Sequence, residues 1–308
     1  MYLGEAPTPE AGEGEVRIKV AAAGVNRADL LQRRGFYPPP KGTSQILGLE
    51  VSGVIDAVGR GVDGFAPGDP VVGLLAGGGY ADYVVAPAGQ VAPAPTSMGI
   101  IEAGGIMETS ATVVSNFDHI HVASGETILI HGGSGGIGSF AIPYAQCLGL
   151  RVLTTVGSPE KADHARQLGA EAFDYHGDWV EEVRQATSGR GVDAILDIIG
   201  AKYLEANVSV LARGGRMTVI GLQGGTKATL DLNALLTKAA TITATSLRFR
   251  PLPEKTQIVE EVADRVWPLF ESGRIPLPPI TTFPLAEAGA AHAFLDSGQN
   301  LGKIILTL

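Results

Sequence analysis

The chain has 308 residues with a formal net charge of −9, and 45% of its residues are hydrophobic. This length favours about two domains, and the acidic balance argues against a nucleic-acid-binding protein. No apolar run is long enough to span a membrane and no signal peptide is visible, so we expect neither a membrane nor a nucleic acid as a partner. The one cysteine, Cys147, can form no internal disulfide, and the expected location is the cytoplasm.

Residues 13–95 have the pattern of an irregular, glycine-rich β region. Residues 16–20 and 51–58 alternate apolar and polar side chains as half-buried strands do, and turns rich in glycine and proline separate such runs. Many short strands without a regular helix indicate a barrel-like β fold.

From residue 126 the pattern changes around one glycine-rich turn. An apolar β run at residues 127–130 leads into HGGSGGIG at residues 131–138, and a helical pattern follows. The turn contains G-x-G-x-x-G between a strand and a helix, the context in which this motif binds a dinucleotide. Its glycines permit a tight turn, close backbone approach to a pyrophosphate and close helix–strand packing, and the helix N-terminus attracts phosphate. The predicted cofactor-binding residues here are Gly133, Ser134, Gly135, Gly136, Ile137 and Gly138.

Strands and helices alternate after this turn. The predicted strands are residues 127–131, 151–156, 172–175, 194–198, 216–220 and 241–245, and the predicted helices are residues 136–148, 159–168, 179–187, 202–211 and 232–239. Six strands with crossover helices form a doubly wound parallel sheet. A long helix (254–272), a proline-rich link, a short helix from residue 285 and a last strand (303–308) follow. This tail is too short for a domain, so we expect it to fold back onto the N-terminal β region. The predicted fold class is α/β, with residues 1–117 and 250–308 as one discontinuous domain and residues 118–249 as a Rossmann domain.

Five segments, in order along the chain, resemble the medium-chain dehydrogenase/reductase superfamily. They are AAGVNRADLLQRRG (22–35), ILGLEVSG (46–53), HGGSGGIG (131–138), AILDIIG (194–200) and NLGKIIL (300–306). Within the superfamily the chain resembles the zinc-free quinone oxidoreductases related to zeta-crystallin, and most of all their p53-inducible branch. The resemblance implies a GroES-like β-barrel catalytic domain beside the Rossmann domain, and the activity of an NADPH-dependent quinone reductase.

The start of the chain departs from the family pattern. Members usually begin with about one extra strand before residues 16–20. We therefore expect either that the start is internal or that the first strand is lost and its partner exposes a sheet edge.

The residues do not favour a zinc site. Zinc-dependent relatives have a Cys where this chain has Asn26, and a His where it has Leu49, next to Glu50. Catalytic zinc takes three protein ligands, usually His, Cys or carboxylate, and Asn26 and Leu49 supply none. Among the six histidines the one close pair, His119 and His121, is expected in a solvated loop. We predict an enzyme without a metal.

The end of the second Rossmann strand indicates the cofactor. Sites that prefer NAD place Asp or Glu there, whereas this chain continues with Gly157, Ser158 and Lys161. A glycine leaves room for the 2′-phosphate of NADPH, a serine can donate to it, and a lysine supplies positive charge. The resemblance adds Tyr175 as a further phosphate contact. The alternatives are that Lys161 is a solvated helix residue and Tyr175 an aromatic on an edge strand. We predict a preference for NADPH.

The nicotinamide is expected in the cleft between the β domain and the carboxyl edge of the sheet. The family pattern places Asn26 and Thr112 beside it, and Tyr37 could line the quinone slot. Structural roles remain open: Asn26 as a turn residue, Thr112 as a helix interior residue, Tyr37 in rigid loop packing and Lys303 as a strand-edge charge. The remaining predicted cofactor contacts are Ile220, Gly221, Leu222, Ser246, Leu247, Arg248, Asn300 and Lys303.

No general acid stands out in the sequence. A quinone that accepts hydride gives a relatively stable anion, so the proton can come from water; one-electron reduction stays open. The expected lining is small, amide or aliphatic, with no metal to polarise an alcohol and no cation for a carboxylate, so quinones rather than alcohols are the predicted substrates. Two alternatives remain: an NADPH-dependent enone or enoyl-thioester reductase, and a non-catalytic NADPH-binding protein. The uncharged strand at residues 241–245 resembles the edge through which relatives pair and predicts a homodimer.

Overall fold

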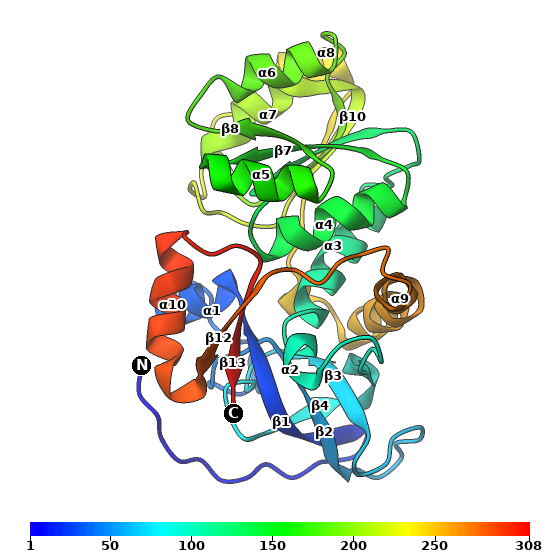
Figure 1. The fold of residues 1–308 in the computed structure, drawn as a ribbon, viewed down its shortest axis with the longest axis vertical. Coiled ribbons are helices and arrows are strands. Elements are labelled where there is room, and N and C mark those ends of the chain that lie inside the picture. The colour runs from blue at the N-terminus through cyan, green and yellow to red at the C-terminus, as the bar shows by residue number, and fades with distance from the viewer. The chain divides into compact units, whose positions relative to one another are not determined.

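The computed structural model describes residues 1–308, which form two units: Met1–Ala111 with Leu247–Leu308, and Thr112–Ser246. The sequence analysis placed the boundaries after residues 117 and 249. The first boundary in the structure falls inside helix α3 (Met107–His119). Both chain termini belong to the first unit (Figure 1).

A seven-stranded sheet is the centre of the first unit. Its strands run in the order β12-β13-β1-β2-β3-β5, and β4 pairs with β1. The apolar residues of β1 alternate into the core, where Val16, Ile18 and Val20 pack with side chains of β2, β3 and β4. The strands are β1 (Glu15–Val25), β2 (Glu50–Val58), β3 (Pro70–Leu74), β4 (Tyr83–Pro87), β5 (Val91–Pro93), β12 (Ile280–Pro284) and β13 (Lys303–Thr307).

The predicted return of the tail to the N-terminal β region is confirmed. Strand β13 pairs antiparallel with β1 and parallel with β12, and the three strands lie side by side (Figure 1). Strand β1, which contains residues 16–20, has partners on both sides, β2 on one and β4 followed by β13 on the other, so it exposes no sheet edge.

The first unit also contains helices that the sequence pattern of the β region did not predict. Helix α1 (Arg27–Arg33) begins directly after Asn26, whose backbone N–H donates to Asp29 Oδ2 at 2.8 Å. This carboxylate at the third helical position is half of a capping box, and it makes a seven-residue helix stable inside the β region. The expectation of no helix in residues 13–95 is therefore wrong. The other helical segments are α2 (Ile100–Ala103), η1 (Ala88–Gln90), η3 (Leu247–Phe249), α9 (Leu252–Glu271), η4 (Leu285–Glu287) and α10 (Ala288–Ser297).

The second unit is a six-stranded parallel sheet, as predicted, and its strands run in the order β11-β10-β9-β6-β7-β8. The chain builds β6, β7 and β8 to one side, then β9, β10 and β11 to the other, so the order reverses between β6 and β9. The strands are β6 (Thr127–His131), β7 (Arg151–Val156), β8 (Glu171–Asp174), β9 (Val192–Asp197), β10 (Leu211–Val219) and β11 (Thr241–Ala244). The helices are α4 (Gly136–Cys147), α5 (Pro159–Gln167), α6 (Trp179–Ala186), η2 (Ala201–Tyr203), α7 (Leu204–Val210) and α8 (Leu232–Lys238).

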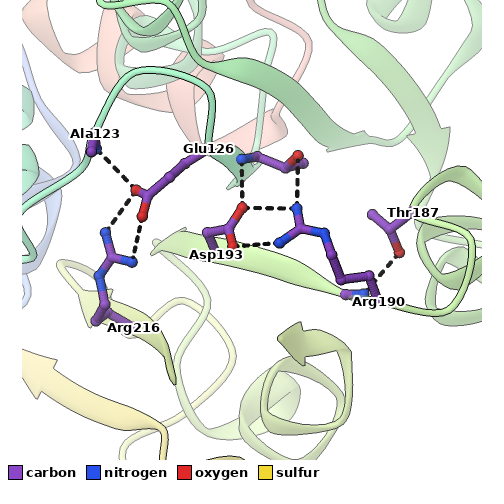
Figure 2. Close-up of polar contacts among 8 residues, drawn as sticks. Ala123, Glu126, Thr187, Arg190, Asp193 and Arg216 are labelled. Atoms are coloured by element: carbon purple, nitrogen blue, oxygen red, sulfur yellow. Dashed lines mark hydrogen bonds and ion pairs between the residues drawn. The ribbon is translucent and has the colours of Figure 1, made fainter. Parts of the chain in front are cut away.

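Ion pairs hold the amino-terminal edge of this sheet (Figure 2). The carboxylate of Glu126 accepts two hydrogen bonds of 2.8 Å from the Arg216 guanidinium, and Asp193 accepts bonds of 2.6 and 2.9 Å from Arg190. These bonds lower the pKa of Glu126 and of Asp193. Glu126 directly precedes β6, Arg190 and Asp193 stand at the start of β9, and Arg216 lies within β10, where it pairs with Thr241 at the start of β11. The network therefore lies at the edge of the sheet opposite to the carboxyl ends of its strands.

No helix of the structure combines the length with the apolar composition that crossing a membrane requires.

Candidate functional site: the carboxyl edge of the Rossmann sheet and a buried lysine cluster

In the glycine turn after β6, the structural reasons for having glycine differ from one position to the next. Gly132 has φ +78°, which favours glycine, and a Cβ on Gly133 or Gly138 would overlap the Thr154 side chain or the Gly133 backbone. Gly135 differs: its φ is −81°, and the one protein atom within 4 Å of an added Cβ is Gly132 O at 3.9 Å. Neither backbone conformation nor packing within the protein requires glycine at 135. The open space at the N-terminus of α4 fits the close approach of a pyrophosphate.

His131, the last residue of β6, fixes the start of this turn. It is completely buried, with Nδ1 2.8 Å from Thr155 Oγ1 and Nε2 2.7 Å from Asn207 Oδ1. Burial lowers the pKa of His131 to about 4, so the imidazole is neutral near pH 7. The sequence analysis assigned His131 no role; its place between an apolar strand and a glycine turn was the available signal.

Three of the residues expected to bind the 2′-phosphate lie together after β7. Ser158 is the N-cap of α5 and accepts from Lys161 N at 3.3 Å, and a Cβ on Gly157 would overlap the Tyr175 hydroxyl. Tyr175 follows β8 and is 43% exposed. The structure therefore brings the Tyr175 hydroxyl next to Gly157, the residue before the Ser158 cap, while Lys161 is in the first turn of the helix.

The ends of β9 and β10 complete this edge of the sheet. The Asp197 carboxylate accepts from Ile199 N at 2.7 Å and Gly200 N at 3.1 Å, and burial raises the pKa of Asp197 to about 6. Ile220, Gly221 and Leu222 follow β10, where a Cβ on Gly221 would lie 2.7 Å from Ile198 O. Leu222 is 53% exposed.

In the first unit, Lys303 is the centre of a buried polar cluster. Its ammonium donates to Glu50 Oε1 at 2.6 Å, to Asn26 Oδ1 at 2.6 Å and to Thr109 Oγ1 at 3.3 Å. Asn26 Nδ2 donates to Glu50 Oε1 at 2.8 Å, and Glu108 N donates to Glu50 Oε2 at 3.0 Å. The exposed fractions are 4% for Lys303, 0% for Glu50, 4% for Thr109 and 9% for Asn26. Lys303, predicted as a cofactor contact, is thus bonded to the predicted catalytic residue Asn26.

A second buried network is centred on Asp29, which bonds the backbone of Asn26. The Asp29 carboxylate accepts from Asn26 N at 2.8 Å, from Gly48 N at 3.0 Å and from the Tyr80 hydroxyl at 3.2 Å. The Tyr80 oxygen lies 3.1 Å from His292 Nε2. Burial raises the pKa of Asp29 to about 6 and lowers that of His292 to about 4. The sequence analysis missed this network because its members come from segments far apart in the chain.

Arg248 and Tyr37 form a further contact of the first unit. The Arg248 guanidinium, 5% exposed, donates to Ala76 O at 2.8 Å and to Tyr37 O at 3.3 Å, and lies 5.3 Å from the centre of the Tyr37 ring. The ring of Tyr37 packs edge-on against Phe249 at 5.4 Å. The Arg248 side chain, expected to contact the cofactor, is therefore bonded within its own unit.

The other predicted residues have simpler surroundings. Thr112 is buried inside helix α3, and its carbonyl accepts from Asn116 Nδ2 at 2.8 Å. Asn300 is buried and donates to Gly302 O at 3.2 Å. Ser246 is exposed and Leu247 is half-buried.

No group of three or more His, Cys, Asp or Glu side chains lies close enough to hold a metal. Leu49 is buried and apolar, and Cys147 is half-buried at the end of α4. His119 is the last residue of α3, with Nε2 2.8 Å from Thr243 Oγ1, so the expectation of a loop is wrong for His119. His121 lies in an exposed turn after the helix, as expected. The donor set for catalytic zinc is missing, and a zinc-free enzyme stays our prediction.

A GroES-like unit and a Rossmann unit with an open glycine turn define a medium-chain dehydrogenase/reductase. Residues 12–96 match the family "Alcohol dehydrogenase GroES-like domain", and residues 136–264 match "Zinc-binding dehydrogenase". The quinone oxidoreductase of Pseudomonas aeruginosa is 33% identical over 305 residues, covering 96% of this chain and 92% of that protein. The chain belongs to the quinone oxidoreductase family of this superfamily.

Solved structures agree with this family. The Escherichia coli quinone oxidoreductase complexed with NADPH is 27% identical, with a TM-score of 0.88 over 99% of this chain and 95% of that one. An NAD-dependent alcohol dehydrogenase is 32% identical, with a TM-score of 0.85 over 99% and 95%. The CurK enoyl reductase is 26% identical, with a TM-score of 0.83 over 99% and 93%.

Much longer proteins also match. The phthioceranic/hydroxyphthioceranic acid synthase of Mycobacterium tuberculosis is 31% identical over 306 residues, which is 96% of this chain. This chain spans 14% of the length of that relative.

Proposed function

We propose that this chain is an NADPH-dependent reductase of quinones that works without zinc. The observation that carries the cofactor assignment is Gly135, a glycine that the protein itself does not require and that leaves space at the N-terminus of α4. A bound NADPH would supply the hydride. Helix α4 would hold the pyrophosphate through its free N–H groups, and Ser158, Lys161 and Tyr175 would bind the 2′-phosphate.

Relatives support the quinone as substrate, since a curated relative and a structural neighbour are both named quinone oxidoreductases. The same comparisons favour one alternative, reduction of an enone or enoyl thioester, because the CurK enoyl reductase has the same fold. A non-catalytic NADPH-binding protein is the second alternative, and turnover separates it from both enzymes.

The test compares initial rates across cofactors and substrates. An ortho- and a para-quinone should turn over with NADPH, while crotonyl thioester and simple enones react slowly and ethanol with NADP⁺ does not react. Two hydrogen bonds to the 2′-phosphate at about 1.5 kcal/mol each favour NADPH over NADH by roughly 100-fold. Lys161→Ala should lose most of this preference. Equal rates with both cofactors would contradict the phosphate assignment, and faster enoyl-thioester reduction would favour the alternative enzyme.

A double variant, Asn26→Ala/Thr112→Ala, serves as the control for turnover. It should still bind NADPH, as followed by cofactor fluorescence, but should reduce quinones far more slowly than the unmodified protein. Undiminished turnover would mean that the reaction happens elsewhere or on free cofactor.

A further inference from the structure

The hydrogen bonds of the lysine cluster leave one amide N–H of Asn26 without a partner. An ammonium has three donors, and all three of Lys303 are directed at Glu50, Asn26 and Thr109. The Glu50 carboxylate accepts on both oxygens, and Gly24 leaves it the room, since a Cβ there would overlap Glu50 Oε1. Asn26 has two amide N–H donors and uses one of them, on Glu50.

The charges of its neighbours fix the orientation of the Asn26 amide. Lys303 can donate but not accept, so the oxygen of Asn26 must face it, and the amide nitrogen must face the acceptor oxygen of Glu50. The reversed amide would set N–H against ammonium and C=O against carboxylate. A buried ion pair of 2.6 Å therefore selects one of the two possible orientations.

Asn26 is also the member of the cluster with the most exposed surface. It is 9% exposed, whereas Lys303, Glu50 and Thr109 are 0–4% exposed. A ligand can therefore reach this cluster through Asn26. A fixed amide donor backed by a buried cation suits an oxygen that gains negative charge during reaction, because preorganised donors stabilise such charge without reorganising.

We infer that Lys303 is a positioning residue that, with Glu50, locks the Asn26 amide so that its second N–H is offered to the carbonyl oxygen of the substrate as it is reduced. This inference rests on the proposed function. It specifies the group of the substrate that Asn26 binds, a carbonyl whose oxygen becomes anionic. Hydride adds to the conjugated system, the electron pair moves onto this oxygen, and water supplies the proton. Lys303 keeps its proton and acts through Asn26.

A double-mutant cycle tests this coupling. Asn26→Ala, Lys303→Met and the double variant are compared for kcat and KM with one para-quinone at saturating NADPH. Each single variant should lower kcat on the order of 100-fold, the typical loss of one preorganised donor, with KM and NADPH affinity nearly unchanged. The double variant should be no slower than the slower single variant, because both remove the same donor. An unchanged kcat in Lys303→Met, or losses that multiply, would overturn the inference.

Stability is controlled separately, because Lys303→Met leaves a buried carboxylate without its partner. The variant Glu50→Gln/Lys303→Met keeps the cluster neutral and should show the same loss of kcat. Arg216→Met is the matched control, because it breaks the ion pair with Glu126 at the amino-terminal edge of the Rossmann sheet in the second unit. It should lower the unfolding temperature and leave kcat unchanged; an equal loss of kcat would assign the effect to stability.

A readout without turnover separates the inference from the proposed function. Side-chain amide NMR identifies the Asn26 resonance by its absence in Asn26→Asp. The unmodified protein should show one slowly and one rapidly exchanging Nδ2 proton, and Lys303→Met should make their exchange alike. If no quinone is reduced but this pattern is found, the proposed function fails and the positioning stands. If quinones are reduced but Lys303→Met leaves the pattern unchanged, the inference fails alone.

Discussion

Gly135 and Gly138 are three positions apart in one turn but are constrained in different ways. An added Cβ at Gly138 would overlap the backbone of Gly133, which cannot move without shifting the turn itself. An added Cβ at Gly135 would meet only Gly132 O, at 3.9 Å. The fold therefore requires glycine at position 138 but not at position 135, where we propose that a ligand does.

We predict that Gly135→Ala lowers the free energy of unfolding by no more than about 1 kcal/mol, the typical disadvantage of Ala at an N-cap, but weakens NADPH binding at least about tenfold. Gly138→Ala should instead lower stability first. Urea unfolding and NADPH titration measure the two effects. Unchanged NADPH affinity in Gly135→Ala would show that no ligand approaches this position.

Individual residues also show which parts of the candidate site could be predicted from the sequence. The glycine turn, Ser158 and Tyr175 follow strand ends, so their shared edge could be predicted from strand order alone. The bond from Lys303 to Asn26 could not, because the two residues are 277 positions apart and no periodicity relates them. One signal was present in the sequence: a lysine is the first residue of the otherwise largely apolar strand Lys303–Thr307, which is buried almost throughout.

At the scale of elements, strands buried on both faces were the easiest to predict. The bounds of β6 and β7 agree with prediction, because continuous apolar or β-branched runs follow directly from a parallel sheet with covered faces. Helix α3 was not among the predicted helices; a helix here was considered only as an alternative role for Thr112. Its Thr, Ser and Val residues are weak helix formers, and burial of the helix overrides that propensity. Strand β12 was missed because it follows a proline-rich link and ends in Pro284, as an edge strand can.

The ion pairs at the amino-terminal edge of the Rossmann sheet make the stability of the second unit depend on pH. Hydrogen bonds from Arg216 hold the pKa of Glu126 below its ordinary 4.5. The stabilisation is therefore fully present above the unfolded value, 4.5, and is lost as the pH falls through the lower folded value.

We predict that Glu126→Gln is less stable than the unmodified protein by about 1–3 kcal/mol at pH 7, as for hydrogen bonds to charged groups. This difference should shrink as the pH falls below about 4.5. Urea unfolding between pH 7 and pH 3 measures it. Glu13→Gln is the control, because its pair with Arg60 is exposed and should contribute little at any pH. A difference that stays constant down to pH 3 would contradict the assignment.

At the scale of the whole molecule, the two edges of the Rossmann sheet differ in charge. Strand β8 begins with Glu171 and ends with Asp174, and charged edges resist pairing. Strand β11, Thr-Ile-Thr-Ala, pairs with β10 alone and carries no charge. The uncharged edge is the one that we propose joins two copies of the chain.

We predict a homodimer that Ala244→Lys converts to a monomer, because a charge on an exposed edge position opposes strand pairing. Ala172→Lys, on the opposite edge strand, should leave the dimer intact. Light scattering at micromolar concentration measures both. A monomeric unmodified protein, or a dimer that survives Ala244→Lys, would count against this interface.

The pairing of β13 with β1 has a consequence for the order of events during synthesis. A ribosome adds about 5–20 residues per second, so the 277 positions from Asn26 to Lys303 take roughly 14–55 seconds to make. Until then the carboxylate of Glu50 lacks its ammonium and β1 lacks one neighbouring strand. Residues 112–246 are continuous, and they leave the ribosome before the first unit can close. Once residue 246 has been made, the second unit can fold while the unit that holds Asn26 still awaits its last strand. Chaperones that bind nascent chains can act on the incomplete unit while residues 247–303 are made.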